Sequence, residues 1–264
     1  MGMVIVFFAV SILSSIAGSI CGIGGGVIIK PVLDATGIMS VSAISFLSGC
    51  TVLAMSVVSV YKNVRSKAAK LDLRIATGLA VGAAVGGVLG KTMFQSLKEA
   101  VGNEAVVGMT QALVLIAVTL GTLIYTVYKQ RIRTKTYTQI WLCVVIGILL
   151  GVMSSFLGIG GGPINLVVLA YFFSMSTKEA ALSSLYIIMF SQITSLIQTC
   201  ATGSIPKVSA AYLAAMVVGG ILGGTLGSKV NKKIREEGVN KLFIALMAVI
   251  IGINIYNAVK FGMA

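Results

Sequence analysis

Long apolar runs separated by short polar links fill this chain almost from end to end. The unbroken runs have about 20 residues, the length that an α-helix needs to cross a hydrocarbon core of about 30 Å. Two apolar pieces of about ten residues follow glycine-rich breaks and are too short to cross alone. The pattern predicts helical segments over residues 3–20, 27–35, 42–61, 73–94, 105–128, 140–157, 163–173, 180–201, 208–230 and 242–259.

The two glycine-rich breaks have nearly the same sequence. The first is Gly22-Ile23-Gly24-Gly25-Gly26, and the second, Gly158-Ile159-Gly160-Gly161-Gly162, follows 136 positions later. An unpaired N–H or C=O group in hydrocarbon is costly, so irregular backbone at membrane depth must line a cavity or be enclosed by protein. Two such breaks at corresponding positions of two halves indicate the substrate site of a secondary transporter.

The second half of the chain repeats the first in order and spacing. Corresponding residues are Ser48 and Ser184 at an offset of 136, the ladders Gly82/Gly86/Gly90 and Gly219/Gly223/Gly227 at 137, and Tyr125/Lys129 and Tyr256/Lys260 at 131. Duplication predicts two transmembrane repeats, residues 1–130 and 131–264, in one membrane domain. The four-residue spacing of the ladders places their glycines on one helix face, which favours close helix packing.

Basic residues occupy different links in the two halves. The link after residues 42–61 carries Lys62, Arg65, Lys67 and Lys70, whereas its counterpart near Lys207 is weakly basic; residues 229–235 are basic and their counterpart is weaker. Basic loops face the cytoplasm, so this exchange predicts inverted repeats with both termini outside. We expect an all-α polytopic membrane protein in which each repeat is a glycine-broken helix hairpin followed by three transmembrane helices. A plain eight-crossing arrangement is the alternative.

Composition supports a membrane protein and restricts its chemistry. Hydrophobic residues make up 57% and charged residues 10%, against about 25% charged in soluble domains, and the mean hydropathy is +1.03. The net charge of +13 fits orientation in a membrane better than nucleic-acid binding, because the basic residues cluster in short links. We expect lipid and no nucleic acid as partners.

The polar inventory argues against an enzyme. The chain has no His, and its four Cys form no CxxC pair, so His-based catalysis, zinc sites and redox motifs are not indicated. Asp34 and Glu179 lie near segment edges and are expected at the membrane interface. We therefore expect no catalytic residue, metal or cofactor.

The glycine breaks are suited to holding an anion. A helix that restarts after glycines presents unpaired N–H groups and the positive end of its dipole, and this combination binds anions. Ser and Thr hydroxyls often bond their own helix instead, and a cation transporter would use the carbonyls of the breaks. The predicted substrate-binding residues are Gly22, Gly24, Gly25, Gly26, Gly158, Gly160, Gly161, Gly162, Asn165, Ser48, Ser184 and Gln192.

An apolar chain of this size with two related halves, each opening with G-x-G-G-G, resembles the TauE/SafE (TSUP) family of sulfite exporters. The first element continues as Val27-Ile28-Ile29-Lys30-Pro31 and the second as Pro163-Ile164-Asn165. The resemblance covers essentially the whole chain. It implies transport of sulfite, sulfonates or related anions across a cell membrane without ATP, driven by proton-motive force. A distantly related class of thiosulfate carriers uses cysteines, which adds Cys21 as a candidate.

These observations predict a carrier, active as a monomer or homodimer, that moves a small sulfur-containing anion by alternating access. An anion channel with the same site and a thiosulfate-type carrier using cysteine are the alternatives. The carrier mechanism requires the two breaks to meet around a hollow that solvent can reach.

Overall fold

The computed structural model describes residues 2–66 and 71–263, and these ranges are helical without any strand. The helices are α1 (Gly2–Cys21), α2 (Gly26–Thr36), α3 (Val41–Arg65), α4 (Leu73–Val101), α5 (Glu104–Tyr128), the 3-10 helix η1 (Lys129–Arg131), α6 (Ile140–Phe156), α7 (Pro163–Phe173), α8 (Thr177–Ala201), α9 (Ala210–Lys233) and α10 (Glu236–Gly262). The predicted all-α fold is confirmed. Lys67 and Lys70 lie outside the described residues.

Polar caps extend several helices beyond the apolar runs. The Ser176 hydroxyl accepts a hydrogen bond from the Glu179 N–H, and the Glu179 carboxylate accepts one from the Ser176 N–H. This reciprocal pair satisfies two free donors at a helix start, so α8 begins at Thr177 rather than at Ala180. Asp72 caps α4 in a similar way by accepting from the N–H groups of Arg74 and Ile75.

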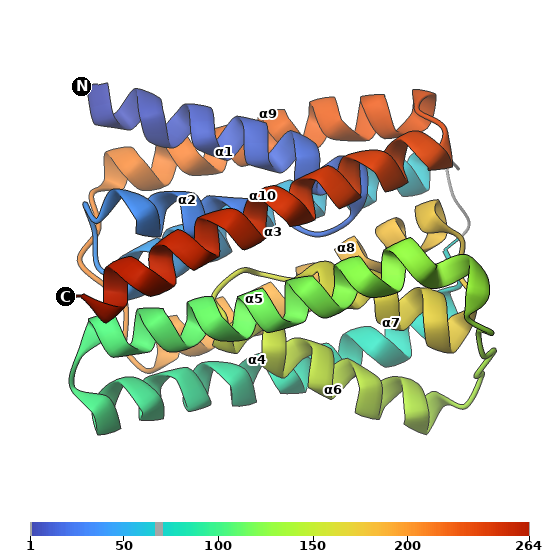
Figure 1. Cartoon of the computed structure of the whole chain (residues 1–264), viewed down its shortest axis with the longest axis horizontal. Helices are drawn as coiled ribbons and strands as arrows, with labels where there is room; N and C mark the ends of the chain where they lie inside the picture. Colours follow the sequence, from blue (N-terminus) through green and yellow to red (C-terminus); the bar gives the residue numbers. More distant parts are fainter. Residues whose placement is uncertain (1, 67–70, 264) are drawn as a thin grey trace.

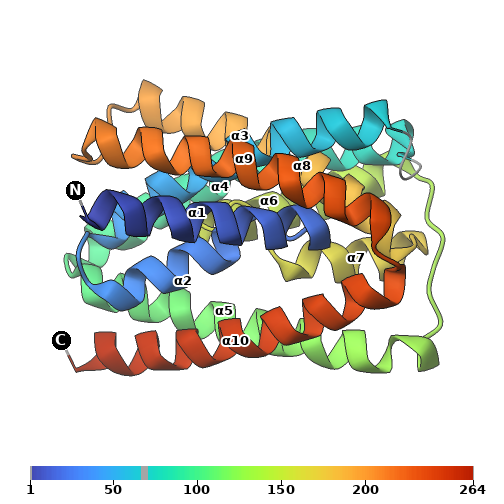
Figure 2. The same cartoon turned by 90° about the horizontal axis from the view of Figure 1, so that it is seen from above.

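The helices run along a common direction, and both chain termini lie at one end of the bundle (Figures 1 and 2). We call this the terminal end. The C-terminal end of α3 and the α5–α6 and α9–α10 connections, which are rich in Lys and Arg, lie at the opposite end (Figure 1), which we call the basic end. Helix α1 begins at the terminal end, whereas its counterpart α6 begins at the basic end.

Seven of the described helices are long and apolar enough to cross a membrane: α1, α3, α4, α5, α8, α9 and α10. Helices α6 and α7 are shorter but apolar. The bundle also carries large apolar side chains on its outside, among them Leu13 at 66% exposure and Trp141 at 67%. An apolar surface of this kind suits lipid rather than water. The chain is a multi-pass membrane protein.

Close helix pairs form through the two glycine ladders, as predicted. A side chain on Gly82, Gly86 or Gly90 of α4 would overlap a backbone carbonyl of α6, from Val144, Ile148 and Val152 in turn. The second ladder lies in the same way against the backbone of α1, near Phe8, Ile12 and Ile16. Each partner on α1 precedes its counterpart on α6 by 136 positions. The duplication therefore extends from the sequence to the contacts, and each repeat packs its first helix on the other repeat.

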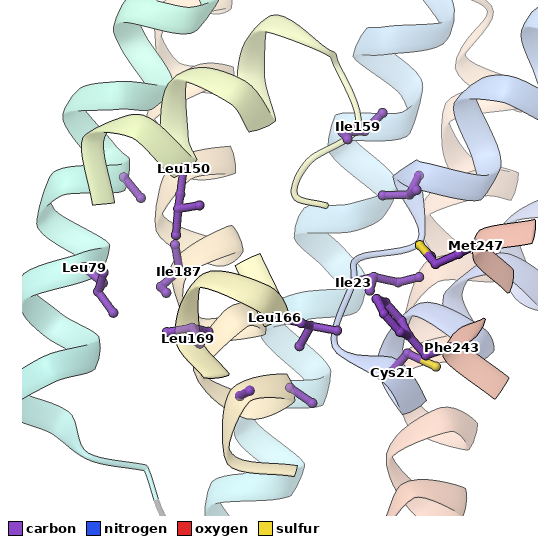
Figure 3. Packing of buried hydrophobic residues seen from close by; sticks show 14 of the residues in the cluster. Cys21, Ile23, Leu79, Leu150, Ile159, Leu166, Leu169, Ile187, Phe243 and Met247 are labelled. Atoms are coloured by element: carbon purple, nitrogen blue, oxygen red, sulfur yellow. The ribbon is translucent and has the colours of Figure 1, made fainter. Parts of the chain in front are cut away.

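The main buried apolar cluster surrounds both glycine breaks. Cys21 and Ile23 at the first break lie beside Phe243 and Met247 of α10, while Ile159 of the second break lies near the same region (Figure 3). These side chains are almost fully buried. The core thus holds the irregular backbone in the interior of the bundle, away from lipid, as irregular backbone at this depth requires.

Candidate functional site: the crossing of the glycine breaks

The two breaks begin with matching turns. Gly22 and Gly24 have φ of 77° and 72°, and their counterparts Gly158 and Gly160 have φ of 64° and 66°. Residues with a side chain rarely adopt these left-handed values, so the path of the chain requires these four glycines. The breaks then differ, because Gly25 is right-handed with φ of −64° whereas its counterpart Gly161 has φ of 129°.

The breaks touch each other and pack reciprocally on the opposite repeat. A side chain on Gly26 would overlap the carbonyl oxygen of Ile159, and one on Gly24 would lie 3.4 Å from the Gly160 oxygen. Around this contact, Gly22 lies against Ala181 and Gly158 against Ser45, and these two partners also differ by 136 positions. The breaks therefore cross in the interior, related to each other by the internal repeat.

Several backbone N–H groups at the crossing have no hydrogen-bond partner. Within the described residues, the amides of residues 24–27 and 160–162 donate none of the hydrogen bonds found. Pro163 begins α7 and has no N–H to satisfy, which is the usual reason for proline at this position. The free donors and the helix dipoles together make this region attractive to an anion.

Buried side chains near the crossing also have free polar atoms. The Asn165 Oδ1 and the hydroxyls of Ser48 and Ser184 have no partner, and all three residues are at most 1% exposed. The Ser48 hydroxyl lies 2.8 Å from the position that a Gly26 side chain would take. Unsatisfied buried polar groups are costly, so a ligand or water that supplied the missing bonds would be stabilised there.

A cavity of about 270 Å³ opens near the basic end and reaches Cys21, which adjoins the first break. Its wall carries Lys129, whose Nζ donates to the Asn240 Oδ1 at 2.9 Å. Burial lowers the pKa of the Lys129 ammonium, and the negative charge of Glu236 opposes this shift. The cavity therefore reaches the edge of the first break, with polar side chains on part of a largely apolar wall.

A second path approaches Gly158 in the other break. A small cavity of about 20 Å³ is lined by Gly158, Gln192 and Lys91, and Lys91 also lines a vestibule of about 490 Å³. The vestibule includes the α8–α9 connection, which lies at the terminal end (Figure 1). The two breaks were expected to meet around a hollow that solvent can reach. This expectation is wrong for the described conformation, because no cavity found in the described residues is lined by both breaks. They pack tightly together, and each is approached by a different cavity.

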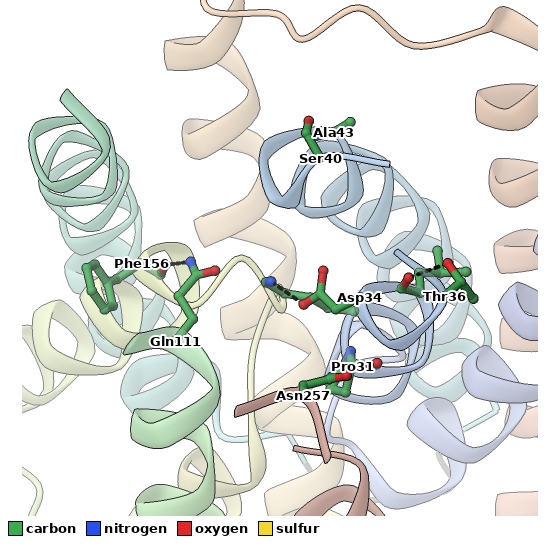
Figure 4. Close-up of polar contacts among 10 residues, drawn as sticks. Pro31, Asp34, Thr36, Ser40, Ala43, Gln111, Phe156 and Asn257 are labelled. Atoms are coloured by element: carbon green, nitrogen blue, oxygen red, sulfur yellow. Dashed lines mark hydrogen bonds and ion pairs between the residues drawn. The ribbon is translucent and has the colours of Figure 1, made fainter. Parts of the chain in front are cut away.

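The region of the other repeat that corresponds to the Cys21 cavity, around Lys30 and Asp34, is filled by contacts between side chains and backbone. Only about 10 Å³ remains there, beside a Lys30–Asp34 ion pair with a 2.6 Å contact. The Asn257 amide donates to the Pro31 carbonyl, and Lys260 donates to that of Ala35. Figure 4 shows Asp34 above the Asn257 side chain, with Gln111 to the left on a different helix.

The structure shows the surroundings of two charged residues that sequence alone did not reveal. Asp34 is buried inside the protein, with 7% exposure, and is paired with Lys30 on the preceding helical turn. The spacing of Lys30 and Asp34 by four residues in an apolar run was the signal for this pair. Lys91 was not predicted as a site residue, since its importance depends on which cavities it borders.

A membrane-embedded helical bundle in which two interrupted elements cross beneath polar cavities defines a membrane transport protein. The chain belongs to the family described as sulfite exporter TauE/SafE, which it matches over residues 7–255. Members of this family are transporters of the cell membrane rather than enzymes. No curated protein and no solved structure matches the chain in the comparisons made.

Proposed function

We propose that this protein is a secondary transporter that moves sulfite, a sulfonate or a related small oxyanion across the cell membrane. The family supports the substrate class. The observation that carries the proposal is the crossing of the two breaks, where free amides lie beside the unpartnered Asn165 and Ser48. Because the breaks pack tightly in this conformation, the repeats must separate before an anion can reach these donors. Binding there would use backbone donors and few fixed cations, which suits a carrier that must also release its substrate.

Unequal closure at equivalent positions supports a mechanism of alternating access. Thr126 and Val167 line the open Cys21 cavity, whereas their counterparts Asn257 and Pro31 are joined by a hydrogen bond. If the repeats are inverted, exchanging these two arrangements would close the Cys21 cavity at the basic end and open the Lys30–Asp34 region towards the terminal end. Basic loops face the cytoplasm, so we assign the structure to an inward-open state with the Lys30–Asp34 region closed outside.

We infer that proton-motive force drives transport through protonation of the anion itself. The only buried carboxylate in the described chain is Asp34, and it is committed to its ion pair with Lys30. A proton carried by the substrate requires no second carboxylate at the crossing. Transport should then follow an imposed pH gradient even in a variant without the Asp34 charge.

Purified protein in liposomes tests the proposed function. Sulfite uptake should saturate and show counterflow, and sulfite should raise the melting temperature because it binds the folded form. Thiosulfate, taurine, sulfoacetate and chloride serve as comparison ligands. Conductance beyond the turnover of a carrier would establish the channel instead, and no response to any sulfur anion would refute the substrate class.

A thiosulfate-type carrier is the second candidate, because Cys21 lies on the wall of the cavity that reaches the first break. The Cys21→Ala variant distinguishes the two. Loss of thiosulfate transport with sulfite transport retained would favour the cysteine mechanism, whereas equal transport of both by the variant would exclude it.

A further inference from the structure

We propose that the small cavity beside Gly158 is an anion subsite in which Lys91 supplies the charge that attracts a compact oxyanion lacking any cationic group. This inference rests on the proposed function and adds a charged entry point to it. The subsite lies between the vestibule and the second break, so an anion held there is one step from the crossing.

Lys91 is a half-buried cation without a counterion. The ion pairs formed within the described residues are Lys30–Asp34 and Lys98–Glu104, and neither includes Lys91. Its Nζ instead lies 5.3 Å from the centre of the Phe94 ring. Partial removal of an ammonium from water is unfavourable unless an opposite charge or hydrogen bonds compensate. An anion in the adjoining cavity would provide both.

The wall of the cavity is rich in donors and contains no carboxylate. The Ser45 hydroxyl has no hydrogen-bond partner although the residue is only 7% exposed. Gln192 and Ser195 are buried to a similar degree and also line the space. Hydroxyls, an amide and one ammonium around a space without acidic groups select for a negatively charged ligand.

The equivalent region of the other repeat has no lysine at the position of Lys91. Ser228 stands at the position corresponding to Lys91, at the ladder offset of 137. There the Ser19 hydroxyl lies 2.9 Å from that of Ser59 and 3.2 Å from that of Ser228. The three hydroxyls satisfy one another, so this copy is closed. Lys91 and the unpartnered Ser45 therefore occur together only in the copy that borders the vestibule.

The dimensions and charge of the subsite restrict its ligand. A space of about 20 Å³ holds little more than one water molecule, so a ligand enters by displacing water and spreading the walls slightly. Sulfite and thiosulfate are compact and purely anionic. Taurine carries an ammonium group, and the positive charge of Lys91 would repel it inside the subsite.

Binding to the full-length protein in detergent tests the subsite, with sulfite, thiosulfate and taurine as probes in titration calorimetry. Lys91→Gln and Lys91→Met remove the charge, and Lys229→Gln is the matched control. Lys229 lies on α9, is exposed, and lines neither the subsite nor the vestibule. We expect both Lys91 variants to bind sulfite at least about tenfold more weakly, as expected for loss of a charge-assisted contact. The control should stay within about threefold of wild type.

Unchanged sulfite affinity in the Lys91 variants, or an equal loss in Lys229→Gln, would overturn the subsite. Wild-type protein that binds taurine as tightly as sulfite would also overturn it, and this comparison needs no variant to fold. If wild type transports sulfite while Lys91→Gln binds it normally, the subsite fails and the proposed function stands. Wild type that neither binds nor transports a sulfur anion overturns both.

Discussion

The carbonyl oxygen of Ile159 occupies the space where a side chain of Gly26 would lie. The two glycine breaks therefore meet through backbone alone, and the contact joins the two repeats at their crossing. Any side chain at position 26 would push the second break away from the first, because the obstacle is backbone rather than the end of a flexible side chain. The geometry of the free amides depends on this approach.

We expect Gly26→Ala to abolish transport and to lower stability by about 1–3 kcal/mol, the usual cost of overpacking. Gly121→Ala is the control, since Gly121 lies within α5 and has no atom within 4 Å of a new side chain. This control should be neutral or more stable, because alanine favours helix over glycine by up to about 1 kcal/mol. Liposome uptake and thermal unfolding measure both effects. Normal transport by a folded Gly26→Ala protein would remove the crossing as the site.

Local sequence pattern was sufficient to predict the helices and the two breaks. Pro163 and the glycines fix helix starts and left-handed turns through their own backbone chemistry, so residues 163–173 were predicted with their observed bounds. The position-by-position repeat likewise predicted which residues correspond. The burial of Asp34 and the exposure of Lys91 to two cavities arise from contacts between helices far apart in sequence. Pattern alone also could not show that one cavity is open and its equivalent is closed.

The two glycine ladders should contribute equally to the stability of the folded protein. Gly86→Val and Gly223→Val both place a side chain against the backbone of a first helix, near Ile148 and Ile12 respectively. We expect each to lower the melting temperature markedly, with similar shifts because the contacts are equivalent. Val85→Ala, on the exposed side of α4, should change it little. A large shift in only one ladder variant would contradict the equivalence.

Replacing one member of the Lys30–Asp34 pair should lower stability far more than replacing both with apolar residues. Both side chains are buried, at 3% and 7% exposure, so Asp34→Asn leaves an ammonium without its partner. Loss of one member of a buried pair costs about 3–5 kcal/mol. The double variant Lys30→Met/Asp34→Leu should recover most of this loss, because an apolar pair is tolerated in the same volume. Thermal unfolding of the single and double variants measures the coupling, and additive losses would show that the pair is not a unit.

Removing the contacts between α2 and α10 should open the closed cavity. Asn257→Ala deletes the hydrogen bond to the Pro31 carbonyl, which lowers the cost of separating the helices at the terminal end. Ala112→Cys, in a background without native cysteines, reports on that cavity because Ala112 lines it and is 5% exposed. Labelling of this cysteine from the terminal side should become faster in Asn257→Ala. Ala170→Cys, at a half-buried position in the open cavity, should label in both backgrounds, and an unchanged rate at position 112 would argue against this gate.

If the transported anion contacts Lys129 in the cavity at the basic end, we expect its binding to depend on pH. Burial lowers its pKa from the ordinary value of 10.5, and Glu236 opposes the shift. Its folded pKa lies below its unfolded pKa, so the protonated lysine opposes folding. Stability from this group therefore increases as the pH rises through the folded pKa towards the unfolded one. The pH dependence of anion binding runs in the opposite direction. The anion needs the charged form of Lys129, so its affinity falls as the pH rises through the lowered pKa of this lysine.

Lys129→Arg should remove this dependence, since a guanidinium stays charged throughout the alkaline range. We expect sulfite affinity, measured at several alkaline pH values, to fall in wild type and to stay nearly level in the variant. Lys241→Arg on the exposed side of α10 should follow wild type. A parallel decline in all three proteins would place the titrating group elsewhere, on the anion or on another side chain. A level response confined to Lys129→Arg would show that the cavity at the basic end contacts the transported anion through this residue.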